Sequence, residues 1–506
     1  MEFRDSSCEP VAGPEQAAVG RSFSAGDVIL TCEPWVWAFN SAAYKDHCAN
    51  CFQEKQGLRT CSGCQLHRYC SKACQVSDWK KEHKLECAML KKVGSNMALI
   101  SLSAGSVEYF GARTFDLVAK IANKIKLNVT MDLGDQGTLS AAEIFGLLPA
   151  NPSSNDGAEP TQESLAESAT ALGISLSEYW TYHQTGGYNA VSVYDIPENH
   201  FPFVLAIYPE APVEAMTPVC WDVNATINFS GRRMIIVATQ DIPNYTGLHD
   251  LRHNRLMRDP FSRPLLERRD VFKLTYRRPC TCRKCTKEFD AETNPLKCMT
   301  PECREPIPSD RRALAPCPQC GAINTDQLVK LMRFTEKCDT LWRNRVDERQ
   351  QVLQNVEYFK DVKAETFLHP DAHIRYIYSY NRYLDFFEEG RCEEGWKLAQ
   401  EMVNCLRNIH PKYDIAFGSK IAAIGIRALE AVRKMVLRTP LAQRKRLQPL
   451  VTAMCPVARS YCKEAEDLYI HVLGPDFAAA VVGRERFAEL EDTISTLQLA
   501  LNGNYR

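Results

Sequence analysis

Residues 48–87 read CANCFQEKQGLRTCSGCQLHRYCSKACQVSDWKKEHKLEC and carry cysteine and histidine at spacings that suit zinc. Two tetrahedral Zn²⁺ sites need eight such ligands, and a Cys-x-x-Cys pair aims two thiolates at one ion through a tight turn. The wider spacings, Cys70 to Cys74 and His83 to Cys87, place both ligands on one face of a helix. The alternating order predicts two interleaved metal sites; the alternative is a set of buried free cysteines. The candidate ligands are Cys48, Cys51, Cys61, Cys64, Cys70, Cys74, His83 and Cys87.

This stretch closely resembles the MYND zinc finger, in YCSKACQ at 69–75, in Trp79 and in HKLEC at 83–87. The resemblance implies a finger that binds proline-containing peptides and whose metals mainly fold the module. His67 fits no ligand position, and we expect it at the surface. The resemblance assigns one zinc ion to Cys48, Cys51, Cys70 and Cys74, and the other to Cys61, Cys64, His83 and Cys87.

Length and composition indicate a globular protein of several domains. The chain has 506 residues, of which 45% are hydrophobic and 24% charged, with a formal net charge of −1. Charge therefore argues neither for nor against nucleic acid, whereas the basic residues lack the interleaved stacking aromatics of a nucleic-acid surface. The amino terminus lacks a secretory signal pattern, and no apolar run reaches about 18 residues. We expect a protein of the nucleus and cytoplasm, without membrane contact or nucleic-acid binding, whose clustered cysteines hold metal.

Strand patterns flank the finger. Residues 28–30 and 33–39 read as paired strands after a turn at 25–27, and 225–229 with 234–238 read as a hairpin around Ser230-Gly231. Short strands, a MYND finger, a helical insert and further strands are together similar to the SET domain of the SET and MYND domain-containing (SMYD) family. The resemblance implies a β-rich lysine methyltransferase fold that is split by the finger.

Two further cysteine groups follow. A Cys-x-Cys-x-x-Cys segment resembles the post-SET zinc site of the family, which takes a fourth ligand from the SET core. The residues concerned are Cys280, Cys282 and Cys285, with Cys220 as the implied fourth ligand. A later pair of knuckles predicts a zinc ribbon, whose alternative is a mobile proline-rich linker. Its ligands are Cys298, Cys303, Cys317 and Cys320. With the finger, these groups predict about four zinc ions per chain.

From about residue 325 the pattern changes to long amphipathic helices. HPDAHI at 369–374 recurs as HPKYDI at 410–415, with a weaker echo, GPDF, at 474–477. These repeats look like tetratricopeptide (TPR)-type helix pairs, which the SMYD family also carries, and stacked pairs would present a concave surface to a peptide or protein. Basic residues from 433 to 446 read as a solvated helix face, or alternatively as a nuclear-import or acidic-partner patch.

The cofactor motifs of the family are altered here. The Asn-His pair that holds S-adenosylmethionine corresponds to Thr217-Pro218, and proline has no amide hydrogen to offer. The expected Gly-x-Gly has only Gly20-Arg21-Ser22 as its nearest counterpart, and Arg252 stands at the position of the active-site tyrosine. Tyr245 or Tyr276 are alternative sources of a phenol. We therefore expect S-adenosylmethionine to bind weakly or not at all, and we assign no catalytic residue.

Two segments keep the family pattern. NAVSV at 189–193 resembles a cofactor-side strand, and Ile207-Tyr208-Pro209 resembles its Leu-Tyr-Pro. Asn189 is accordingly the one candidate cofactor-binding residue, and a turn or strand-edge asparagine is the alternative interpretation.

The sequence thus predicts a multidomain α+β protein. Its segments are the N-terminal part of a split SET domain (1–47), a MYND zinc finger (48–87), a helical SET insert (88–185), the C-terminal part of the SET domain (186–255), a post-SET segment (256–290), a zinc-ribbon-like segment (291–324) and a TPR-like helical domain (325–506). The predicted function is protein–protein interaction in transcription or chromatin regulation, with little or no methyl transfer. The alternative is an active S-adenosylmethionine-dependent protein-lysine N-methyltransferase with a histone or non-histone substrate.

Overall fold

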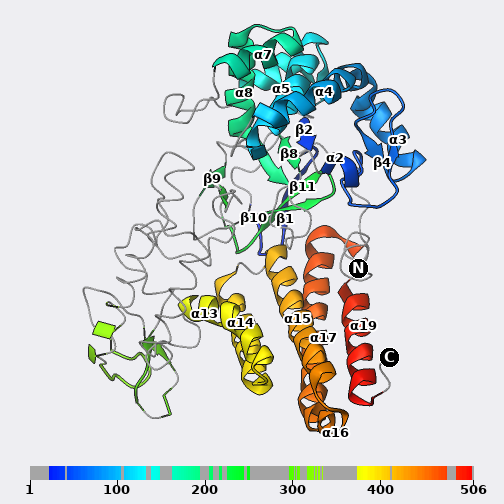
Figure 1. Cartoon of the computed structure of the whole chain (residues 1–506). Helices are drawn as coiled ribbons and strands as arrows, with labels where there is room; N and C mark the ends of the chain where they lie inside the picture. Colours follow the sequence, from blue (N-terminus) through cyan, green and yellow to red (C-terminus); the bar gives the residue numbers. More distant parts are fainter. Residues whose placement is uncertain are drawn as a thin grey trace. The chain divides into compact units, whose positions relative to one another are not determined.

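The structure, a computed structural model, divides into two compact units. Unit 1 comprises Met1–Thr217 with Ile227–Asp250, and unit 2 comprises Pro218–Thr226 with Leu251–Arg506. The described residues are 22–39, 43–103, 108–132, 138–148, 162–193, 204–208, 216–218, 225–243, 248–250, 296–300, 302–303, 305–307, 316–323, 325–326, 329–330, 333, 373–410, 413–475 and 486–503. The predicted mixed α+β fold with a helical C-terminal region is confirmed (Figure 1).

Two main sheets belong almost wholly to unit 1, which holds all of their strand residues except 218 and 225–226. The five-stranded sheet has the order β1-β11-β10-β12-β9, and the three-stranded sheet has the order β2-β8-β7. The first is built from β1 (Val28–Cys32), β9 (Met216–Pro218), β10 (Ala225–Ser230), β11 (Arg233–Ala238) and β12 (Leu248–Asp250). The second is built from β2 (Val36–Phe39), β7 (Val191–Val193) and β8 (Val204–Ile207). Strands from before the finger therefore pair with strands from long after it.

The predicted hairpin at 225–238 is confirmed, with β10 and β11 as neighbours. Its turn lies at Gly231 and Arg232, and Gly231 has a φ of 59°, in the left-handed region that favours glycine. The predicted pairing of 28–30 with 33–39 is wrong, because β1 pairs with β11 and β2 pairs with β8. All four residues of β2 and of β8 are buried, so matching apolar faces, and not proximity along the chain, select the partners.

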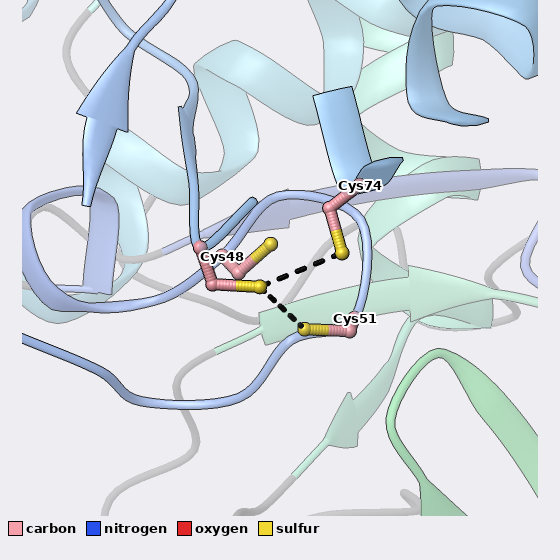
Figure 2. Close-up of side chains that lie close together, drawn as sticks. Cys48, Cys51 and Cys74 are labelled. Atoms are coloured by element: carbon pink, nitrogen blue, oxygen red, sulfur yellow. Dashed lines mark hydrogen bonds between the residues drawn. The ribbon is translucent and has the colours of Figure 1, made fainter. Parts of the chain in front are cut away.

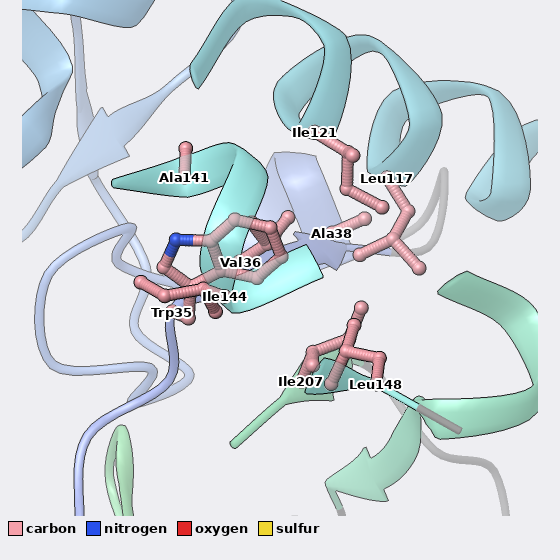
Figure 3. Close-up of a cluster of buried hydrophobic side chains, with 9 residues drawn as sticks. All are labelled: Trp35, Val36, Ala38, Leu117, Ile121, Ala141, Ile144, Leu148 and Ile207. Carbon is pink, nitrogen blue, oxygen red and sulfur yellow. The ribbon is translucent and has the colours of Figure 1, made fainter. Parts of the chain in front are cut away.

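Helices cover the three-stranded sheet. Trp35, Val36 and Ala38 pack against Leu117 and Ile121 and form part of one apolar cluster (Figure 3). Two of the helices, α6 and α8, start at capping boxes in which Ser140 pairs with Glu143 and Ser175 with Glu178. The elements of this region are α4 (Lys84–Ser103), α5 (Glu108–Lys126), β5 (Thr130–Asp132), β6 (Thr138–Ser140), α6 (Ala141–Leu147), α7 (Gln162–Leu172) and α8 (Leu176–Asn189).

Within unit 2, long helices pack around α15. This helix contacts α13, α14, α17 and α19, and α13 also contacts α14. The bounds are α13 (His373–Glu388), α14 (Cys392–Ile409), α15 (Ile415–Arg438), α16 (Leu441–Arg444), η5 (Lys445–Leu447), α17 (Gln448–Leu473) and α19 (Arg486–Leu501). The two HP repeats immediately precede or overlap the starts of α13 and α15. Among the described helices, none has the length and apolar character to cross a membrane.

The crossing of α15 and α17 is made by small residues. A Cβ placed on Gly425 would lie 3.3 Å from both Cα and Cβ of Ala458, and one on Gly418 would lie 3.3 Å from Cα of Ala465. Both glycines face α17, so the two backbones approach closely at both points. The two glycines therefore allow the axes to approach closely, with Leu468 and Tyr461 packed beside the contact points.

Arg444, one of the predicted basic residues, caps helix ends. Its guanidinium donates to the carbonyls of Thr439 at 2.8 Å and Leu437 at 3.3 Å, close to the end of α15. It also donates 2.7 Å to the carbonyl of Ala500 in the last turn of α19. Carbonyls at a helix end lack partners within the helix, and a cation stabilises them. Arg444 thus belongs to the internal structure of the helical unit.

Candidate metal centres

The first centre gathers four cysteines from separate parts of the finger. Cys48 follows α2 (Ala43–Asp46), Cys51 lies in the following turn, Cys70 follows β4 (Arg68–Tyr69), and Cys74 lies in α3 (Lys72–Asp78). The Sγ atoms of Cys51 and Cys70 are 3.8 Å apart, and those of Cys70 and Cys74 are 3.5 Å apart. Figure 2 shows Cys48, Cys51 and Cys74 with their sulfurs close together. Ser71 caps α3 by accepting from the Cys74 amide at 3.1 Å, which sets the start of the ligand helix.

The second centre joins Cys61, Cys64, His83 and Cys87. The Sγ atoms of Cys61 and Cys87 are 3.9 Å apart, and His83 Nε2 lies 3.3 Å from Cys61 Sγ. Two short elements position these residues. Cys61 follows β3 (Arg59–Thr60), which pairs with β4, and His83 ends the π-helical segment η1 (Trp79–His83). A Cβ on Gly63 would lie 2.7 Å from Cys87 Sγ, so glycine leaves the space that this sulfur occupies.

The sulfur spacings test whether zinc fits. A Zn–S bond of about 2.3 Å in a tetrahedron puts neighbouring sulfurs about 3.8 Å apart, whereas a disulfide would bring them to about 2.0 Å. The Sγ–Sγ distances of 3.5–3.9 Å in the two finger centres agree with tetrahedral thiolate coordination. Cysteine and histidine donors with little free space also suit a closed structural zinc site.

A third group lies beside a short hairpin in unit 2, formed by β13 (Leu296–Lys297) and β14 (Pro306–Ile307). Cys298 Sγ is 3.5 Å from Cys320 Sγ, and Cys303 Sγ is 3.6 Å from Cys317 Sγ. A tight turn supports Cys317 and Cys320, because the Gly321 amide donates 2.8 Å to the Cys317 carbonyl. The structure therefore gathers the four residues of the predicted ribbon. Together the three groups suggest several zinc ions.

The other predicted site residues have mixed outcomes. Asn189 ends α8, is buried, and donates its Nδ2 to the Thr185 carbonyl at 2.8 Å. Tyr208 is buried and donates its hydroxyl to the Arg232 carbonyl at 2.9 Å. Thr217 and Pro218 lie in β9. The remaining predicted positions lie outside the described residues: Gly20, Arg21, Cys220, Tyr245, Arg252, Tyr276, Cys280, Cys282 and Cys285.

The prediction that His67 lies at the surface is wrong. His67 is fully buried, and its ring stacks on Trp37 at 5.1 Å and on the candidate ligand His83 at 4.8 Å between ring centroids. Burial lowers the pKa of His67 to about 4, so the ring is neutral at pH 7. The alternation of a strand gives the signal that was missed, because His67 and Tyr69 are two residues apart and both point inward.

A buried ion network, which the sequence did not reveal, surrounds this core. Asp78, Glu82 and Glu86 recur at helical spacing through α3, η1 and α4, and all three are buried. Asp78 accepts from Arg232 at 3.1 Å and from the Tyr69 hydroxyl at 2.8 Å. The spacing of the three acids alone is typical of a solvated helix face.

Glu82 is the centre of the ion network. It pairs with Arg232, lies 3.3 Å from Lys124 Nζ, and accepts from Trp37 Nε1 at 2.8 Å. Burial alone would raise the pKa of Glu82, but the attraction of Arg232, Lys124 and Lys120 outweighs it and lowers that pKa. Glu82 is therefore held ionised among these cations.

Comparison with known proteins identifies part of the chain. The MYND finger family matches residues 48–87. The chain is 37% identical over 76 residues to N-lysine methyltransferase SMYD2-A of Xenopus laevis, covering 15% of this chain and 17% of that protein. It is 25% identical over 286 residues to N-lysine methyltransferase SMYD2 of Gallus gallus, covering 54% and 58% respectively. It is 26% identical over 279 residues to N-lysine methyltransferase SMYD2 of Mus musculus, covering 53% of this chain and 56% of that protein. The longer of these matches therefore span a little more than half of either protein.

Proposed function

From its place as a distant member of the SET and MYND domain-containing (SMYD) family, we propose that this chain is a zinc-stabilised protein-interaction factor. Its MYND finger implies protein–protein interaction. We place its action in transcription or chromatin regulation, in the nucleus and cytoplasm. The partners would be proline-containing peptides at the finger and a further peptide or protein on TPR-like repeats in the helical region. The zinc ions would have a structural role, held by the three ligand groups and by the predicted post-SET group.

The observation that carries this proposal is the exposed aromatic surface beside the second metal centre. Trp79 is 42% exposed, and Val76, three residues earlier, is 40% exposed. The Trp79 ring also makes an edge contact with the candidate ligand His83, at 5.7 Å between centroids. Metal coordination would thus hold a half-exposed indole in place, and aromatic surfaces of this kind bind the rings of proline-containing peptides.

Replacement of Trp79 by alanine is expected to weaken peptide binding about tenfold or more, because an aromatic anchor in an interface carries much of its free energy. The measurement is fluorescence anisotropy of labelled proline-containing peptides, each with a counterpart in which alanine replaces the prolines. Leu147→Ala, at a residue of α6 that is 64% exposed, is the matched control for loss of an exposed apolar side chain. Equal peptide affinities of Trp79→Ala and Leu147→Ala would contradict peptide binding by the finger. Equal binding of the proline-containing peptides and their alanine counterparts would contradict it as well.

Weak methyl-transfer chemistry is the second part of the proposal, and an active methyltransferase is its rival. By the family resemblance, Thr217-Pro218 stands at the position of the Asn-His pair. Each lost hydrogen bond to a buried ligand group weakens binding by roughly 1 kcal/mol or more. Two or three such losses lower the affinity of a micromolar site by about 10²-fold to 10³-fold.

Calorimetric titration of the zinc-loaded protein with S-adenosylmethionine is therefore expected to show millimolar binding or none. The double variant Thr217→Asn/Pro218→His restores the family's pair and is expected to bind more tightly than the parent. Saturable binding of the parent at low micromolar concentration would instead favour the protein-lysine N-methyltransferase.

A further inference from the structure

The turn of the β10–β11 hairpin sits directly against the finger. A Cβ on Gly231 would lie only 2.7 Å from the Cys51 carbonyl oxygen, so the backbone of the turn meets a candidate ligand residue of the first centre. The next residue, Arg232, extends to Asp78 and Glu82 on the helical side of the finger. Its own carbonyl accepts from the Tyr208 hydroxyl, which fastens the turn to the end of β8. The β10–β11 turn therefore contacts both the loop that carries Cys51 and the helical segment that carries Asp78 and Glu82.

Buried ion pairs strengthen the contact between the finger and the rest of unit 1. Arg232 is almost fully buried, and its side chain is also 3.7 Å from Glu33. Lys120 of α5 lies 3.7 Å from Glu86, and Lys124 lies 3.3 Å from Glu82 and 3.9 Å from Glu86. The Lys120 ammonium also lies 3.7 Å from the centre of the Trp37 ring. Finger carboxylates and body cations thus neutralise one another away from water.

The acids alternate with the metal ligands along the same helical stretch. Asp78 lies between Cys74 and His83, whereas Glu82 and Glu86 directly precede His83 and Cys87. Metal coordination that holds the ligand residues in place therefore also holds the three carboxylates in place. If the finger unfolds, Arg232 loses Asp78 and Glu82 and keeps the more distant, half-exposed Glu33, while Lys120 loses Glu86. Breaking buried ion pairs in this way is strongly unfavourable for a folded protein.

We propose that zinc binding by the finger and folding of the surrounding body are thermodynamically linked through Arg232. Loss of zinc would loosen the β10–β11 hairpin and α5, and loss of the Arg232 contacts would in turn loosen the zinc. The peptide-binding finger is then a fixed part of unit 1, and its metal state regulates the sheet next to it. This linkage rests on the zinc-binding part of the proposed function and is independent of peptide binding.

The first test measures zinc release from the full-length protein to a chromogenic chelator. Arg232→Ala is expected to release finger zinc about tenfold to a hundredfold faster than the parent, because a finger without these contacts opens more often and exposes its zinc to the chelator. Arg233→Ala removes the exposed neighbouring guanidinium and is expected to leave the rate unchanged. Arg232→Lys keeps the charge and should fall between them. Equal release from Arg232→Ala and Arg233→Ala would overturn the proposal.

The reciprocal test measures hydrogen exchange in the parent protein before and after chelation, so it does not depend on how the variants fold. Amides of β11 and α5 are expected to exchange at least tenfold faster without zinc, while those of α17, in the other unit, keep their protection. Cys298→Ser removes only the third centre and should leave β11 and α5 unaffected. Faster exchange confined to 48–87 would contradict the linkage even if the finger still bound zinc and peptide as proposed.

Discussion

Cys61→Ser is expected to unfold the finger and to lower the zinc content by about one to two ions per chain, because both interleaved centres depend on the same fold. Structural zinc contributes roughly 10–16 kcal/mol to the folding of small zinc modules, which exceeds the stability of many whole domains. Elemental analysis would give the zinc content, and limited proteolysis would show cleavage within 48–87. Because the helical region belongs to the other compact unit, residues 373–503 are expected to stay resistant.

A milder change at the second centre distinguishes weakened zinc coordination from a general loss of stability. Gly63→Ala introduces a methyl group where Cys87 Sγ lies and is expected to weaken zinc binding while the ligands themselves remain. Gly94→Ala, in α4, meets only ordinary contacts at 3.9–4.0 Å and serves as the matched control. A full zinc complement in Cys61→Ser, or equal zinc retention by both glycine variants, would argue against the second centre.

Trp37→Ala is expected to destabilise unit 1 by about 5 kcal/mol, near the upper end for a buried aromatic residue. Trp37 is fully buried, donates to Glu82 and stacks on His67, so its removal opens a cavity and leaves a buried carboxylate short of a donor. Urea unfolding followed by hydrogen exchange over β2, β8 and α5 would measure the change. Trp79→Ala removes an equally large side chain from a half-exposed position and should lower stability by much less. Similar losses in the two variants would contradict the central role of Trp37.

Local spacing predicted much of the metal chemistry, and long-range packing explains the errors. The ligand pairs of the finger are close in sequence, and the Ser230-Gly231 signal predicted the hairpin at 225–238, since both depend on turn geometry. The partners of β1 and β2 depend on strands more than 150 residues later, which no local pattern encodes.

The candidate site was predicted unevenly for the same reason. His67 and Glu82 carry polar side chains in a polar stretch, so their burial follows only from the cations and aromatic rings that α5, β2 and the hairpin turn bring to them. Arg232 likewise reads as an ordinary turn residue, because its carboxylate partners lie about 150 positions earlier. The metal-ligand groups could be predicted from the sequence spacing of cysteine and histidine. The buried ion pairs that join the finger to the rest of unit 1 could not.

The close approach of α15 and α17 determines how the helical region responds to load. At Gly425 a Cβ would lie 3.3 Å from Cα of Ala458, so the two backbones are close and packed tightly enough to resist sliding or tilting of one helix against the other. We expect α15 and α17 to move together as one rigid pair. A partner that binds along it would meet a surface already in its final shape, and little conformational freedom would be lost on binding.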